Sequence, residues 1–151
     1  MGRGSLALAM TLVMILHLNS PALLGMEGSG RGTEARDSSL DILMLGNSYT
    51  STNSLEVRLD SILTDSGEDA VVTSLTSGGL KLSEHAERAG TSGHSWNASL
   101  QQQHDYVILQ DQSQVPGLST ETEYWQESLQ GLEYLNQRIE SQGGDTILFM
   151  T

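Results

Sequence analysis

The sequence has 151 residues, enough for one domain, with a net charge of −12 and no cysteine. A strongly acidic surface repels phosphate backbones, so this charge argues against nucleic-acid binding. Without cysteine the chain has no disulfide, no thiolate nucleophile and no zinc site with cysteine ligands.

Residues 1–25 have the layout of a secretory signal peptide. Arg3 precedes an apolar run from Leu6 to Leu18, and small, turn-prone residues follow the run. This run is shorter than the roughly 20 apolar residues that a membrane span needs. We therefore expect export to a secreted, periplasmic or cell-surface location, with no stable membrane span after cleavage. A flexible leader of small, polar and charged residues is expected over residues 26–39.

Strand and helix patterns alternate from Leu40 onward. Strands are expected at 40–45, 70–75, 106–110 and 146–150, and helices at about 53–66, 80–88, 96–103 and 121–142. No two strands are close enough for a hairpin. The pattern predicts an α/β fold, a flavodoxin-like three-layer α/β/α domain over residues 40–151 with a mostly parallel sheet. Because the sequence stops at the end of the fourth strand, we expect the C-terminal part of this domain to be missing from it.

Three polar loops are expected at one edge of the sheet, where ligands bind in open parallel sheets. They are Gly46-Asn47-Ser48, Ser77-Gly78-Gly79 and Gln110-Asp111-Gln112-Ser113. Ser48 would stand at a sharp strand-to-helix turn, where backbone N–H groups can stabilise an oxyanion. Gly78 or Gly79 could bring another N–H close, and Gln112 could add a side-chain amide.

Each loop also has a simpler interpretation. A serine before a helix is most often an N-cap, and a glycine pair after a strand is most often a turn. The occurrence of all three loops at one sheet edge favours a catalytic site.

The segments LMLGNSYT, TSGGLKLSEH and DYVILQDQSQVP resemble the SGNH hydrolase superfamily, which includes the GDSL esterases and lipases. The resemblance extends over about residues 41–151. It implies that Ser48 is the catalytic nucleophile and that Gly79 (or Gly78) and Gln112 form the oxyanion hole. We also expect Asn47 and Ser113, beside these groups, to contact the substrate.

The resemblance includes two departures. Asn47 stands where the commonest first block has aspartate, and Gln112 stands where the third block has asparagine. Some branches of the superfamily are similar to this sequence, with Gly-Asn-Ser followed later by Leu-Gln-x-Gln-Ser. The resemblance implies that the protein hydrolyses carboxylic ester bonds, either those of carbohydrate O-acetyl groups or those of lipids. The reaction would pass through an acyl-enzyme and would need no metal or organic cofactor.

A serine nucleophile needs a general base, which the superfamily supplies from an Asp-x-x-His motif near the C-terminus. This sequence has no residue after Thr151. His17 falls in the predicted signal peptide, and His94 and His104 are expected toward the opposite sheet edge. His85 is expected to be a partly exposed helix residue or a pocket-wall group. The catalytic aspartate and histidine are therefore predicted to be absent from this chain, which we expect to be inactive or nearly so.

Other functions are compatible with parts of the sequence. A nucleotide or phosphate binder is disfavoured because the first loop lacks the P-loop spacing and no Gly-x-Gly-x-x-Gly motif occurs. A non-catalytic exported binding module of the same fold, or an inert exported acidic protein, would also fit. Trp96, Tyr124 and Trp125 could line a sugar site or pack in the core.

Overall fold

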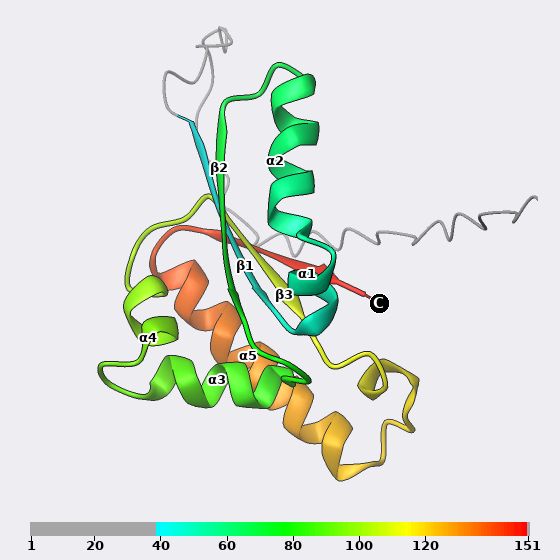
Figure 1. Cartoon of the computed structure of the whole chain (residues 1–151). Coiled ribbons are helices and arrows are strands. Elements are labelled where there is room, and N and C mark those ends of the chain that lie inside the picture. Colours follow the sequence, from blue (N-terminus) through cyan, green and yellow to red (C-terminus); the bar gives the residue numbers. More distant parts are fainter. Residues whose placement is uncertain (1–38, 151) are drawn as a thin grey trace, which may run out of the picture.

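The computed structural model describes residues 39–150 (Figure 1). The predicted signal peptide, and all but the last residue of the predicted leader, lie outside the described residues. The elements in chain order are β1 (Leu40–Gly46), α1 (Ser48–Thr52), α2 (Leu55–Asp65), β2 (Ala70–Thr76), α3 (Leu82–Gly90), α4 (Ser95–Ser99), β3 (Tyr106–Gln110), a 3₁₀ turn (Val115–Gly117), α5 (Glu123–Ser141) and β4 (Asp145–Phe149). The predicted alternation of strands and helices is confirmed.

The sheet has the order β2-β1-β3-β4, and all its strand pairs are parallel. From β1 the chain moves toward one lateral edge of the sheet to form β2. From β2 and from β3 it moves toward the other lateral edge, to form β3 and β4. Right-handed crossovers therefore place α2 on one face and α3 and α5 on the opposite face, as Figure 1 shows. This is the predicted three-layer arrangement. The strand order reverses between β1 and β3, and ligands bind in open sheets at such switch points.

The core lies mainly on the face covered by α3, α4 and α5. Side chains of a strand alternate between faces, and Leu43 and Leu45 of β1 join Val107 and Leu109 of β3 in the main core cluster. Trp96 of α4 belongs to the same cluster. The buried side chains of both central strands explain why these strands were recognisable as continuous apolar runs.

The segment after Ser48 forms two helices rather than the single expected one. Ser54 lies between them with a φ of 47°, a left-handed conformation that interrupts the helical hydrogen bonding. The predicted helix then runs from Leu55 to Asp65, but none of its residues is fully buried, and Ile62 is 61% exposed. This face of the sheet is therefore covered more thinly than the other.

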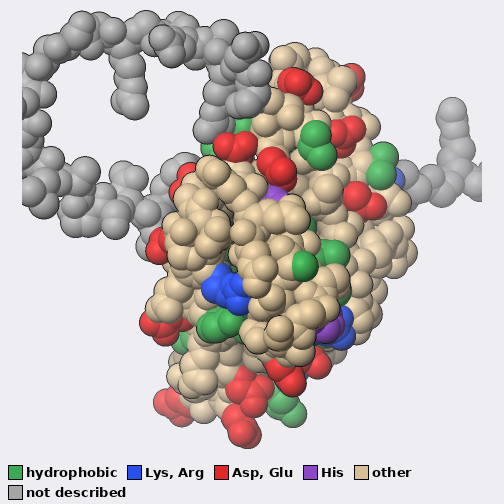
Figure 2. All heavy atoms as spheres, turned by 90° about the vertical axis from the view of Figure 1, so that its left-hand side faces the viewer, with side chains coloured by type: hydrophobic (Ala, Val, Ile, Leu, Met, Phe, Trp, Pro, Cys, Tyr) green, Lys and Arg blue, Asp and Glu red, His purple; other side chains and the backbone are tan. Residues whose placement is uncertain are grey.

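Helices α3 and α5 pack against each other with their backbones in close contact at Gly131. A Cβ atom at Gly131 would lie 2.7 Å from both the Leu82 carbonyl carbon and the Ser83 nitrogen. This contact fixes the start of α3, which follows the second predicted loop, against α5. Within residues 39–150 no helix is long and apolar enough to cross a membrane. Figure 2 shows acidic side chains spread over one face of the molecule and only a few basic groups among them.

Candidate active site

The turn from β1 to α1 leaves the Ser48 hydroxyl free. Asn47, not Ser48, is the N-cap of α1, because its side-chain oxygen accepts a hydrogen bond from the Tyr49 N–H at 3.1 Å. Ser48 is the first residue of the helix and is exposed. Its hydroxyl forms no hydrogen bond with any residue in the described part of the chain. The simpler interpretation of Ser48 as a cap is therefore wrong.

The sharpness of this turn depends on Gly46. A Cβ atom at Gly46 would lie 2.2 Å from Thr50 Oγ1 and 3.0 Å from Gln110 Oε1. These two side chains fill the space, and the Thr50 hydroxyl donates to Gln110 Oε1 at 2.7 Å. The same Gln110 oxygen accepts the Asn47 N–H at 3.1 Å, so β3 holds the turn that presents Ser48.

Asn47 connects all three predicted loops. Its amide nitrogen donates to the Leu80 carbonyl at 3.3 Å and to the Asp111 carbonyl at 3.0 Å. The side chain is only 1% exposed and all its polar atoms are engaged within the protein. Asn47 is therefore buried beneath the loops and holds them together, and its contact with a substrate stays a prediction.

The second loop is a β-turn that leaves two backbone N–H groups unpaired. The Leu80 N–H donates to the Ser77 carbonyl at 3.4 Å, and Gly79, at the third position of the turn, has a φ of 70°. A type II turn has this positive φ, which favours glycine. Gly78 and Gly79 are exposed, and the N–H of neither pairs with another described residue. Either N–H is thus available to a ligand.

The third loop orients the Gln112 amide. Gln112 Oε1 accepts a hydrogen bond from the Gln114 N–H at 2.7 Å. Gln112 Nε2 has no partner among the described residues, so its hydrogens are the free end of the amide. Ser113 is half-buried and likewise forms no hydrogen bond within residues 39–150, and its contact with a substrate stays a prediction.

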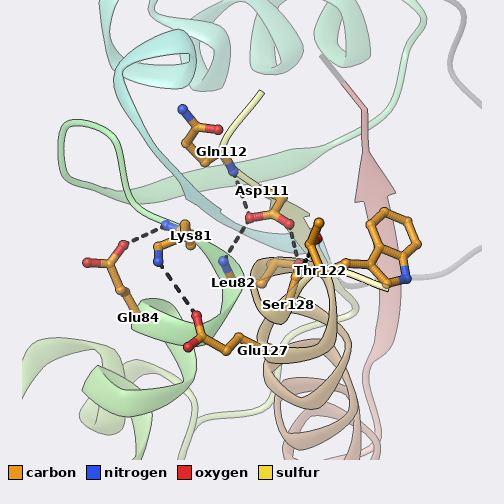
Figure 3. Close-up of polar contacts among 9 residues, drawn as sticks. Lys81, Leu82, Glu84, Asp111, Gln112, Thr122, Glu127 and Ser128 are labelled. Atoms are coloured by element: carbon orange, nitrogen blue, oxygen red, sulfur yellow. Dashed lines mark hydrogen bonds and ion pairs between the residues drawn. The ribbon is translucent and has the colours of Figure 1, made fainter. Parts of the chain in front are cut away.

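Asp111 fixes the third loop to the helices behind it, as Figure 3 shows. Its carboxylate accepts hydrogen bonds from the Gln112 N–H at 2.7 Å, from the Leu82 N–H at 3.0 Å at the start of α3, and from the Ser128 hydroxyl of α5. A carboxylate is favoured at a helix N-terminus. Sequence reasoning missed this function, because Ser128 and Leu82 are distant in the chain and nothing local marks them as partners of Asp111.

An apolar cavity of about 250 Å³ lies between α5 and the ends of β3 and β4. Its walls include Trp125, Leu132 and Phe149, together with Asp111 and Ser128, which bond to each other. Since Asp111 precedes Gln112, the cavity adjoins the third loop. Trp96, in contrast, is buried and packs in the core.

None of the three described histidines is placed to activate Ser48. His104 is buried at the opposite sheet edge, where its Nδ1 lies 2.7 Å from the Asp41 carboxylate. His94 is the N-cap of α4. His85 is fully buried rather than partly exposed, and its Nδ1 accepts a hydrogen bond from Trp96 Nε1 at 2.9 Å. Burial, with a smaller effect of the Arg88 charge, lowers the pKa of His85 to about 4.

No group of three or more histidine, aspartate or glutamate side chains in the described part of the chain is placed to hold a metal ion. The main groups of the site are a free hydroxyl and three N–H donors that have no partner among residues 39–150, on loops that leave one sheet edge. Such donors suit a developing oxyanion.

Known structures share this arrangement of strands and helices. A proposed SGNH hydrolase from Slackia heliotrinireducens superposes with a TM-score of 0.60 and 27% identity, over 74% of this chain and 55% of that one. The chain is related to the SGNH hydrolase superfamily. Two further structures share the fold. TesA superposes with a TM-score of 0.55 and 18% identity, over 72% of this chain and 58% of TesA. A variant of the esterase AlinE4 superposes with a TM-score of 0.56 and 16% identity, over 76% of this chain and 60% of that one.

The chain thus spans little more than half the length of the SGNH hydrolase-like structure that it matches with 27% identity. No family model and no curated protein sequence matches it. The relation to the superfamily confirms the resemblance seen in the sequence.

Proposed function

We propose that Ser48 is the nucleophile of an esterase that cleaves carboxylic esters of carbohydrates or lipids outside the cytoplasm. In this reaction Ser48 Oγ attacks the ester carbonyl carbon, the alcohol leaves, and water then releases the acyl group from Ser48. The Gly79 N–H and the Gln112 amide are assigned to the oxyanion. The observation that carries the proposal is that Asn47, not Ser48, is the N-cap of α1, so the Ser48 hydroxyl is exposed and has no partner among residues 39–150.

The arrangement of the neighbouring groups supports this assignment. Gln112 is held through its oxygen, which leaves only N–H donors to face a ligand. The apolar cavity beside the third loop suits an ester with an apolar group. The general base must be a group other than His85, His94 and His104, and we expect the 151-residue chain to turn over esters slowly or not at all.

Because turnover is expected to be weak, the test measures the nucleophile directly. The chain is treated at alkaline pH with a fluorophosphonate, so that hydroxide removes the serine proton, the Oγ–P bond forms and fluoride leaves. Peptide mass spectrometry then compares modification of Ser48 with that of Ser51, which is exposed on the same helix. An oxyanion hole without a base retains roughly 10³-fold catalysis, so Ser48 should be modified far faster.

Ser48→Ala is the control for the site of modification, and Gln112→Ala should slow the reaction at Ser48 without changing that at Ser51. Equal modification of Ser48 and Ser51 would contradict the proposal. It would favour the alternative of a non-catalytic binding module, which the positions of the three described histidines also suggest.

A further inference from the structure

The Asn47 side chain forms hydrogen bonds to residues that are adjacent in the chain to Ser48, Gly79 and Gln112. Asn47 precedes Ser48 in the chain, and its amide donates to the carbonyls of Leu80 and Asp111. Leu80 follows Gly79, and Asp111 precedes Gln112. Other bonds join the loops in pairs, such as the Ser77 N–H to the Gly46 carbonyl at 3.3 Å and the Asn47 N–H to Gln110 Oε1 at 3.1 Å. The buried Asn47 side chain is the one group that links all three loops within residues 39–150.

We propose that Asn47 is a positioning residue that sets Ser48, Gly79 and Gln112 relative to one another, an inference that rests on the proposed function. Its amide nitrogen supplies one hydrogen to each of the two loops, while its oxygen caps α1. No other side chain at this edge bonds to all three loops in the described part of the chain.

The residue type is decisive at this position. Both acceptors are carbonyl oxygens, which need a donor, and an ionised carboxylate has none to offer. An aspartate, which the commonest first block of the superfamily has here, would therefore face two carbonyl oxygens without a hydrogen. In this chain Gln110 completes the arrangement, because its oxygen accepts the Asn47 backbone N–H and the Thr50 hydroxyl.

Two substitutions separate the functions of this side chain. Asn47→Ser keeps an oxygen that can cap α1 but removes the amide nitrogen, and its single hydroxyl hydrogen on a shorter side chain cannot serve both carbonyls. Asn47→Asp also keeps the cap, but it places a carboxylate against the two carbonyls. Burial beside these oxygens raises the pKa of such a carboxyl group, so acidification restores a neutral group with one hydrogen to donate.

A matched control is available at the far end of α3. Asn97 Nδ2 donates to the Ala89 carbonyl at 2.6 Å, so Asn97→Asp makes the same chemical change away from the loops. The readouts are the backbone amide NMR shifts of Gly79 and Gln112 between pH 7.5 and 4.5, and the fluorophosphonate rate at Ser48. Circular dichroism checks that each variant is folded.

At neutral pH both Asn47 variants should change the backbone amide NMR shifts of Gly79 and of Gln112. Both should also lower the rate at which the fluorophosphonate modifies Ser48 by about 10-fold or more, which is the scale of losing a positioned oxyanion donor. In Asn47→Asp the two amide shifts should move back toward their wild-type values on acidification, whereas Asn97→Asp should leave them unchanged throughout. Should only residues next to position 47 shift, or should Asn97→Asp have an equal effect, the inference is wrong.

If wild-type Ser48 does not react at all, the proposed function fails, while the NMR comparison still decides whether Asn47 links the loops. If Asn47→Asp does not fold, Asn47→Ser decides by the same shifts and the same rate.

Discussion

The buried His85 makes the free energy of unfolding depend on pH. In the folded chain its pKa is about 4, chiefly because burial disfavours the charged ring, whereas the ordinary value is 6.5. Between these values the unfolded chain binds a proton that the folded chain does not, so stability falls as the pH falls. The slope is about 1.4 kcal/mol per pH unit, which gives a loss of about 2 kcal/mol at pH 5 and about 3 kcal/mol at pH 4.

Urea unfolding followed by circular dichroism, at pH values from 7.5 to 4, measures this loss. The control is His85→Gln, whose side-chain oxygen can still accept the Trp96 N–H but does not titrate. Subtracting its unfolding free energy from that of the wild type isolates the contribution of His85. The difference should be constant above pH 7 and fall by about 2 kcal/mol at pH 5. A difference that stays flat over the whole range would refute the reasoning.

Four glycine substitutions test the close contacts and the turn geometry of the fold. Gly131→Ala should lower the urea midpoint, although helix propensity alone predicts a gain of about 1 kcal/mol, because the new Cβ would press on the backbone of α3. An unchanged or raised midpoint would contradict the close packing of α3 and α5. Gly46→Ala should destabilise the fold by about 1–3 kcal/mol by displacing Thr50, and an unaffected midpoint would show that the turn can relax. Gly79→Ala should lower the free energy of unfolding by about 1–2 kcal/mol, because Gly79 has a positive φ. Gly78 has no positive φ and open space around it, so Gly78→Ala should leave this free energy nearly unchanged. Equal effects of the two substitutions would refute the turn geometry.

The strands were predictable because their signal is local. In β1 the apolar residues from Ile42 to Leu45 are buried on both faces of the sheet, and in β3 Val107 and Leu109 are buried on one face and Ile108 is partly buried on the other. Polar residues follow this apolar run in β3, so the strand over residues 106–110 was predicted with its observed limits. The positions of the three loops followed from the strand ends. The break at Ser54 was missed because its left-handed conformation occurs at a residue that rarely adopts it.

The details of the site depend on contacts between distant residues. Asn47 and Ser48 are both good capping residues and adjacent in the chain, so local rules could not decide which of them caps α1. The decision comes from Leu80 and Asp111, whose carbonyls hold the Asn47 amide in place. The hydrogen bond between His85 and Trp96 likewise joins two different helices, and no local pattern predicts it.

The most direct test of the account is a crystal structure of the chain after phosphonylation of Ser48. The account predicts that one phosphonyl oxygen lies within about 3.1 Å of both the Gly79 nitrogen and the Gln112 amide nitrogen, the range of oxyanion-hole donors. A phosphonyl group that points into solvent, with neither nitrogen within hydrogen-bonding distance, would contradict it.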